Sequence, residues 1–258
     1  MNDFLEFEFS HKNISHKVFK KGNGPGIIII HELPGMVKEC VNFARNLEKE
    51  GFTVYLPLLF GEPNKELDVI DTIKLFRKVC ISKEFDLFSN NKTSPVVEFL
   101  KGLCKFAKEE TSSKGVGAIG MCLTGGFVIP MVVESSLLAP VLSQPSLPLN
   151  PLFRNEIGCS KEDYETACSR IKKEKIKVLG FKFSEDILSH NDKFKKLETD
   201  LMNNFEGDII DSSLGNSHKI PFYAHAVFTK DFVEQKDHPT YNAYLKLISY
   251  FKEKLLNT

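Results

Sequence analysis

The chain has 258 residues, of which 42% are hydrophobic and 26% charged, with 34 basic and 34 acidic side chains. This length and composition predict one globular domain spanning residues 1–258. A formal charge of zero provides no long-range attraction to nucleic acid or to an anionic membrane, so we expect a small-molecule partner. No stretch approaches the ~18 consecutive apolar residues of a membrane helix, so we also expect no membrane span.

Cysteine usage indicates a reducing compartment. The six cysteines are widely spaced and include no CxxC pair, which argues against both a disulfide framework and a thiolate metal site. The first residues lack the basic and apolar regions of a signal peptide. We therefore expect a cytoplasmic protein with free thiols and with neither a metal nor an organic cofactor.

Strand-like patterns open the chain. Residues 4–9 and 16–20 alternate between apolar and polar side chains, which predicts a pair of antiparallel strands. After the glycine-rich turn at 22–26, the run Gly-Ile-Ile-Ile-Ile-His at 26–31 is short, apolar and β-branched. Such a run is typical of a strand that is covered on both faces, as in a parallel sheet.

Helical and strand-like segments then alternate for most of the chain. Helices are expected at 37–50, 66–78, 95–109, 161–173 and 192–204, from about residue 122, and in a last segment ending at 255. Strands are expected at 53–57, 115–120, 138–143, 176–181 and 220–224. This alternation predicts an α/β protein with three layers, built on a mostly parallel, doubly wound sheet that carries an antiparallel strand pair at its N-terminal side. Ligands of such sheets bind beyond the carboxyl ends of the strands.

One cysteine follows such a strand end in a distinctive context. The sequence Gly-Met-Cys-Leu-Thr-Gly-Gly at 120–126 has the form of a nucleophile turn between a strand and a helix. A thiol at Cys122 would lie at a helix N-terminus, where free N–H groups favour the thiolate. Most free cysteines are merely small buried hydrophobic residues, but this context favours a reactive one. Thr124 departs from the simplest form of the turn and is bulkier than the usual glycine.

Several motifs, in order, resemble the dienelactone hydrolase family of α/β hydrolases, and the resemblance covers nearly the whole chain. The motifs are His-Glu-Leu-Pro-Gly at 31–35, the segment 115–126, Ala-Pro-Val-Leu-Ser-Gln-Pro-Ser-Leu-Pro at 139–148, Phe-Ser-Glu-Asp at 183–186 and His-Ala-Val-Phe-Thr at 225–229. The resemblance implies the α/β-hydrolase fold and hydrolysis of a small ester, lactone or thioester. The family's substrate-binding arginines have no matching position, so the machinery can be shared without the dienelactone substrate.

The resemblance also implies the roles of individual residues. Cys122 would attack the substrate, His225 would transfer protons, and Asp186 would hold the imidazole in its working tautomer. Glu32 would be a supporting carboxylate near the thiol. Each of the last three has a simpler interpretation. His225 could be a structural histidine, and Glu32 could be a first-turn carboxylate stabilised by the helix dipole. Asp186 could cap the next helix, and Glu185 or Asp192 would then be the partner of the imidazole.

Other positions are expected to complete the site. The oxyanion hole would be formed by the backbone N–H groups of Leu33 and Leu123, each of which follows a strand. His31 and Gln144 also follow strands, and Phe85 lies in an excursion at 78–91 where substrate contacts often arise. These three are expected to line the substrate pocket.

Two other functions remain open from the sequence. The chain could be a ligand-binding module that kept the fold without turnover, because fold alone does not establish function. It could also be a thiol redox sensor built on Cys122, although no resolving cysteine lies nearby in sequence. All three triad residue types occur in the expected order, which favours the hydrolase.

Overall fold

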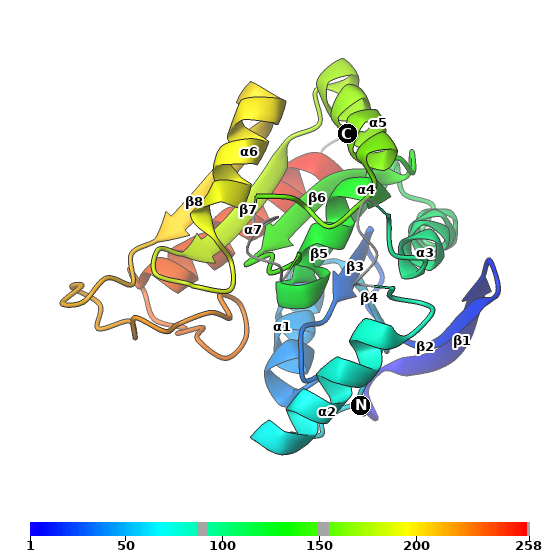
Figure 1. The fold of residues 1–258 in the computed structure, drawn as a ribbon. Helices are drawn as coiled ribbons and strands as arrows, with labels where there is room; N and C mark the ends of the chain where they lie inside the picture. The colour runs from blue at the N-terminus through cyan, green and yellow to red at the C-terminus, as the bar shows by residue number, and fades with distance from the viewer. Residues whose placement is uncertain (87–91, 149–154, 257–258) are drawn as a thin grey trace.

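Eight strands form a single sheet in the computed structural model, which describes residues 1–86, 92–148 and 155–256 (Figure 1). The strand order is β1-β2-β4-β3-β5-β6-β7-β8. The pairs β1–β2 and β2–β4 are antiparallel, and every pair from β4 to β8 is parallel. This is the mostly parallel sheet, with an antiparallel strand pair at one edge, that the sequence predicts.

The elements have the following bounds. The strands are β1 (Leu5–His11), β2 (Ile14–Lys21), β3 (Gly26–Ile30), β4 (Thr53–Pro57), β5 (Val116–Met121), β6 (Leu137–Ser143), β7 (Val178–Phe183) and β8 (Phe205–Ile210). The α-helices are α1 (Lys38–Lys49), α2 (Val69–Ile81), α3 (Val96–Glu110), α4 (Val128–Met131), α5 (Lys161–Glu174), α6 (Asn191–Leu201) and α7 (Pro239–Leu255). In the described part of the chain, the 3₁₀ helices are η1 (Cys122–Phe127) and η3 (Met202–Asn204).

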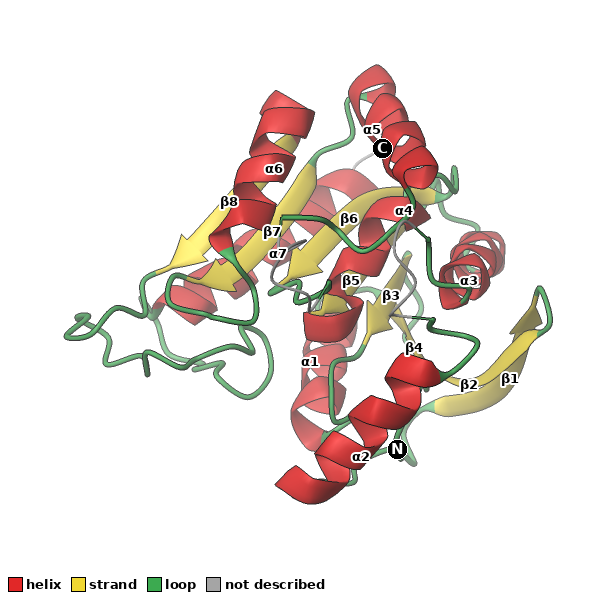
Figure 2. Ribbon diagram, in the orientation of Figure 1, coloured by secondary structure: helices red, strands yellow, loops and turns green. Residues whose placement is uncertain are grey.

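The sheet separates two hydrophobic clusters, which makes the three layers. Along β3, Ile27 and Ile29 pack on the face covered by α1 and α7, whereas Ile28 and Ile30 pack on the face covered by α3, α4, α5 and α6 (Figure 2). All four isoleucines are fully buried. Burial of one such side chain stabilises the fold by about 2 kcal/mol, so a strand with apolar residues at every position belongs at the centre of this sheet.

The parallel strands place their carboxyl ends at one edge. The registers pair Ile30 of β3 with Gly120 of β5, Met121 of β5 with Ser143 of β6, and Ser143 with Phe181 of β7. The loops that follow these strands therefore start side by side.

The predicted strand at 220–224 is wrong. These residues lie in the long connection between β8 and α7, and the eighth strand is instead β8, which the sequence pattern did not predict. The apolar residues misled the prediction because the two ends of this stretch, Ile220 and Ala224, are buried in the core, whereas Phe222 and Tyr223 between them are exposed. By contrast, β8 is an edge strand with several partly exposed residues, so it shows no continuous apolar run.

Among the helices of the described residues, none has the length and apolar character needed to cross a bilayer.

Candidate active site

Cys122 is the first residue of η1, immediately after β5. Its φ of 53° lies in the left-handed region, which costs a non-glycine residue free energy. The turn is tight, since a Cβ on Gly120 would clash with the carbonyl oxygen of Thr124. As a result the Cys122 side chain lies at the carboxyl edge of the sheet and is only partly buried.

Thr124 braces this turn. Its hydroxyl accepts a hydrogen bond from the amide of Met121 at 3.1 Å and lies 2.9 Å from the carbonyl oxygen of Ile30 and 3.0 Å from that of Met121. The carbonyl of His31 is 3.3 Å away. The threonine that departs from the simplest turn is fully buried and joins the end of β3 to the nucleophile turn.

His225 and Asp186 are in direct contact. Nδ1 of His225 lies 2.7 Å from Oδ2 of Asp186, whose side chain is only 2% exposed. The other oxygen of Asp186 accepts hydrogen bonds from the amides of Leu188 and Ser189, at 3.0 and 3.2 Å. Helix α6 is capped by the side chain of His190, so Asp186 does not have the capping role that was its simpler interpretation.

The loop that carries His225 is held by a residue that sequence reasoning missed. The amides of His225 and Ala226 both donate to Oδ2 of Asp231, at 2.9 Å each. Asp231 closes the turn by reaching back to it, since its own amide also donates to the carbonyl oxygen of Ala226 at 3.0 Å. An aspartate six positions after His225 was the signal in the sequence that could have identified it.

The electrostatics of His225 favour the charged imidazole. Burial lowers its pKa, but the neighbouring Asp186 carboxylate and Cys122 sulfur outweigh burial and raise the pKa to about 11. Its Nε2 atom is buried and has no hydrogen-bond partner in the part of the chain that the structure describes. A proton taken from the thiol would therefore be held strongly at Nε2.

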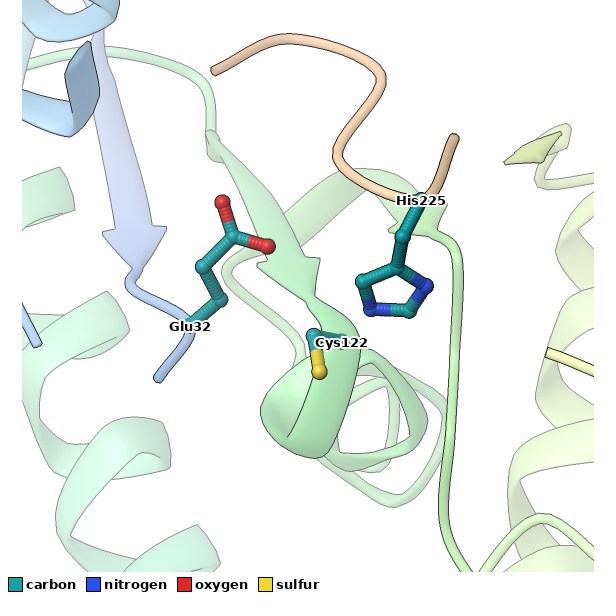
Figure 3. A group of neighbouring side chains, drawn as sticks. All are labelled: Glu32, Cys122 and His225. Atoms are coloured by element: carbon teal, nitrogen blue, oxygen red, sulfur yellow. The ribbon is translucent and has the colours of Figure 1, made fainter. Parts of the chain in front are cut away.

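Glu32 lies beside the thiol and is held by two hydrogen-bond donors. Thr229 donates its hydroxyl to Oε1, and Nε2 of Gln144 donates to Oε2 at 3.0 Å. Burial raises the pKa of Glu32, while Thr229, His225 and Gln144 each act to lower it. Cys122, His225 and Glu32 offer three ligand atoms within 4.8 Å of one another (Figure 3). Within residues 1–86, 92–148 and 155–256, this is the group that could hold a metal ion.

Ser146, in the motif that follows β6, also contacts the nucleophile. Its hydroxyl lies 3.5 Å from Sγ of Cys122, and its amide donates to the carbonyl oxygen of Cys122 at 3.0 Å. This contact fixes the Cys122 backbone from the side of β6.

The three residues expected to line the pocket have different surroundings. Gln144 is fully buried, with a φ of 34°, and is bonded to Glu32. Both ring nitrogens of His31 are engaged with backbone groups, Nε2 with the amide of Leu59 at 3.1 Å and Nδ1 with the carbonyl of Glu32 at 3.2 Å. Its ring is fully buried, which lowers its pKa to about 4. His31 therefore has no ring nitrogen left for a substrate.

Phe85 lies on a cavity of about 600 Å³. Leu147, Ile157 and Tyr164 also line this cavity. So do Lys196 and Asp200, which form an ion pair at 3.1 Å. Leu147 directly follows Ser146, which contacts Cys122. Of the excursion at 78–91 that was expected to provide substrate contacts, residues 87–91 lie outside the described part of the chain.

The two amides expected to form the oxyanion hole occupy neighbouring loops. Leu123 is the second residue of η1, and the first amides of a helix have no partner within it. Leu33 is in the loop after β3, the same loop that Thr124 joins to the nucleophile turn. Both backbone segments are thus attached to one rigid turn.

Comparisons with known proteins agree with the fold. Solved structures with a similar fold include a candidate dienelactone hydrolase from Klebsiella pneumoniae (16% identity, covering 97% of this chain and 99% of that chain, TM-score 0.65). A dienelactone hydrolase from Anabaena variabilis (14%, 98% and 99%, 0.60) and a cold-adapted esterase from an Arctic intertidal metagenomic library (11%, 97% and 93%, 0.61) are also similar. No curated protein sequence matches this chain. Because the model of the dienelactone hydrolase family matches residues 15–252, the chain belongs to the dienelactone hydrolase family.

Proposed function

We propose that this chain hydrolyses a small carboxylic ester, lactone or thioester with Cys122 as the nucleophile, His225 as the general base and acid, and Asp186 as the residue that orients His225. The observation that carries the proposal is the 2.7 Å contact between His225 and Asp186, with the unpartnered Nε2 of His225 beside the thiol. The family and the esterase neighbour support ester hydrolysis in general.

Each step follows from these positions. Nε2 of His225 takes the thiol proton, and the thiolate adds to the substrate carbonyl, whose oxyanion accepts hydrogen bonds from the amides of Leu33 and Leu123. The tetrahedral intermediate collapses, and the imidazolium protonates the leaving alkoxide or thiolate. His225 then removes a proton from water, which attacks the acyl-enzyme and releases the acid and the free thiol. Neither a metal nor an organic cofactor enters these steps.

Glu32 has a supporting role in the proposal. Its carboxylate lies near both the thiol and the imidazole, where its negative charge stabilises the imidazolium. Resemblance to the family assigns a second carboxylate at this place that changes partner as the thiolate forms.

The proposal extends to the location, the domain organisation and the substrate class of the protein. The six cysteines are all free thiols, which supports a reducing, cytoplasmic location. We propose one catalytic domain over residues 1–258, supported by the sheet that runs without interruption from β1 to β8. The balanced charge supports a small-molecule substrate rather than nucleic acid.

A panel of p-nitrophenyl esters, lactones and thioesters tests the proposal. We expect turnover by the unmodified chain, a covalent acyl adduct on Cys122 by mass spectrometry, and loss of at least ~10³-fold in kcat for Cys122→Ala and His225→Ala. Cys159→Ser serves as the matched cysteine control and should retain activity. Turnover that survives Cys122→Ala would show that another group is the nucleophile.

A further inference from the structure

The cluster of Glu32, Cys122 and His225 contains the ligand types of a zinc site. A carboxylate oxygen, a sulfur and an imidazole nitrogen lie within 4.8 Å of one another (Figure 3). Zinc favours these donors in a tetrahedral arrangement at about 2.0–2.3 Å, which places neighbouring ligands roughly 3.3–3.7 Å apart. The 4.8 Å spread of the three atoms is about 1 Å wider than that spacing, so side-chain adjustment would have to accompany binding.

Each of the three groups keeps an atom with a lone pair that can still bind an ion. His225 is bound to Asp186 through Nδ1, which leaves the buried, unpartnered Nε2 for a metal ion. Each oxygen of Glu32 accepts one hydrogen bond, and a carboxylate oxygen has two lone pairs. The Cys122 thiol is partly exposed at the turn, so an ion can reach it from solvent.

The second shell is also that of a metal site. A ligating histidine commonly donates its other ring N–H to a carboxylate, as His225 does to Asp186 at 2.7 Å. The ligating carboxylate is likewise fixed by hydrogen bonds, here from Gln144 and Thr229. Three protein ligands leave a fourth position open for water.

We infer that Glu32, Cys122 and His225 together form a reversible binding site for Zn²⁺ or another borderline-soft divalent ion, and that its occupation blocks the thiol. The metal would use the lone pairs that the nucleophile and the base need, so binding and turnover exclude each other. That inhibitory consequence rests on the proposed function, whereas the binding itself does not.

Co²⁺ provides a spectroscopic test that does not depend on activity. Titration of the full chain with Co²⁺ should give a sulfur-to-metal charge-transfer band in the near ultraviolet that saturates at one ion per chain and is displaced by Zn²⁺. We expect Cys122→Ala to abolish the band and Glu32→Gln to weaken binding by ~10-fold or more. Cys159→Ser, which changes a cysteine outside the cluster, should leave the band unchanged.

The second-shell residue Gln144 gives a test that keeps all three ligands. Gln144→Leu should weaken Co²⁺ binding by ~10-fold while the charge-transfer band persists at saturation. A band that remains in Cys122→Ala, or binding that is equal in Glu32→Gln and the unmodified chain, overturns the proposed site.

The two proposals can fail separately. A Cys122-dependent band in a chain without esterase activity would support the metal site and reject the proposed function. Esterase activity that is insensitive to Zn²⁺, with no Co²⁺ band, would reject the metal site and leave the proposed function standing. Inhibition by Zn²⁺ that chelation reverses, and that competes with substrate, is the result expected when both hold.

Discussion

Oδ2 of Asp186 lies 2.7 Å from Nδ1 of His225, although 39 positions separate the two residues in the chain. Asp186 comes from the loop after β7 and His225 from the connection between β8 and α7. The contact fixes the tautomer of His225 and leaves Nε2 toward the thiol. Four variants, one at Asp186 and three at buried residues around the candidate site, test what these side chains contribute to activity and to stability.

Replacing Asp186 should disable the histidine without unfolding the chain. Asp186→Asn keeps the size of the side chain but removes the negative charge that helps to raise the pKa of His225. We expect kcat/KM to fall on the order of 10³–10⁴-fold, and the alkaline limb of the pH profile to move to lower pH because the imidazolium is less stable. Steady-state kinetics across pH measure both. The exposed neighbour Glu185→Gln is the control, and an equal loss there would contradict the assignment.

Thr124 should be needed for its hydroxyl rather than its size. Thr124→Val keeps the volume but leaves the Met121 amide and the Ile30 carbonyl without this buried partner. The expected cost is about 2 kcal/mol in the free energy of unfolding, with lower kcat because the nucleophile turn and the Leu33 loop are no longer joined. Thr124→Ser should recover most of both. Denaturant unfolding is the measurement, with the exposed Thr199→Val as the comparison.

His31 should make stability depend on acid pH. It is neutral in the folded chain, where burial lowers its pKa to about 4, but in the unfolded chain it takes a proton near 6.5. Unfolding therefore takes up a proton between pH 6.5 and 4, and the free energy of unfolding falls as the pH falls through that window. The full effect is about 3 kcal/mol, at about 1.4 kcal/mol for each pH unit.

His31→Gln should remove this dependence, so its free energy of unfolding should vary less between pH 6.5 and 4 than that of the unmodified chain. Urea unfolding at several pH values measures the slope. Parallel slopes for the two proteins would mean that His31 is protonated in the folded chain as well.

Gln144 should keep Glu32 ionised. Burial raises the pKa of Glu32, and the hydrogen bond from Gln144 opposes that effect. In Gln144→Leu the pKa of Glu32 should rise further, so the acid limb of kcat/KM should move to higher pH if the charged carboxylate is required. The exposed Gln235→Leu is the matched substitution. An unchanged acid limb in Gln144→Leu would separate Glu32 from the reaction.

The sequence by itself determined the parts of this protein that depend on local pattern. The isoleucine run of β3 and the alternation of strands and helices predicted the fold class, because burial on both faces requires apolar residues at every position. The turn around Cys122 was identifiable because its glycines and its place after a strand are local features. The same reasoning failed at 220–224, where a loop with buried ends has the composition of a strand.

The tertiary structure decided which side chains meet. Glu32 is clamped by Gln144 and Thr229, which are 112 and 197 positions away, and Ser146 reaches Cys122 across 24 positions. Nothing in the local sequence encodes these contacts, since they arise where the loops after β3, β5 and β6 meet the loop before α7. The tertiary structure also showed that both ring nitrogens of His31 bond to the backbone, and that the hydroxyl of Thr124 bonds to the backbone on both sides of the turn. Contacts between distant residues depend on the packing of the whole sheet, which only the folded chain provides.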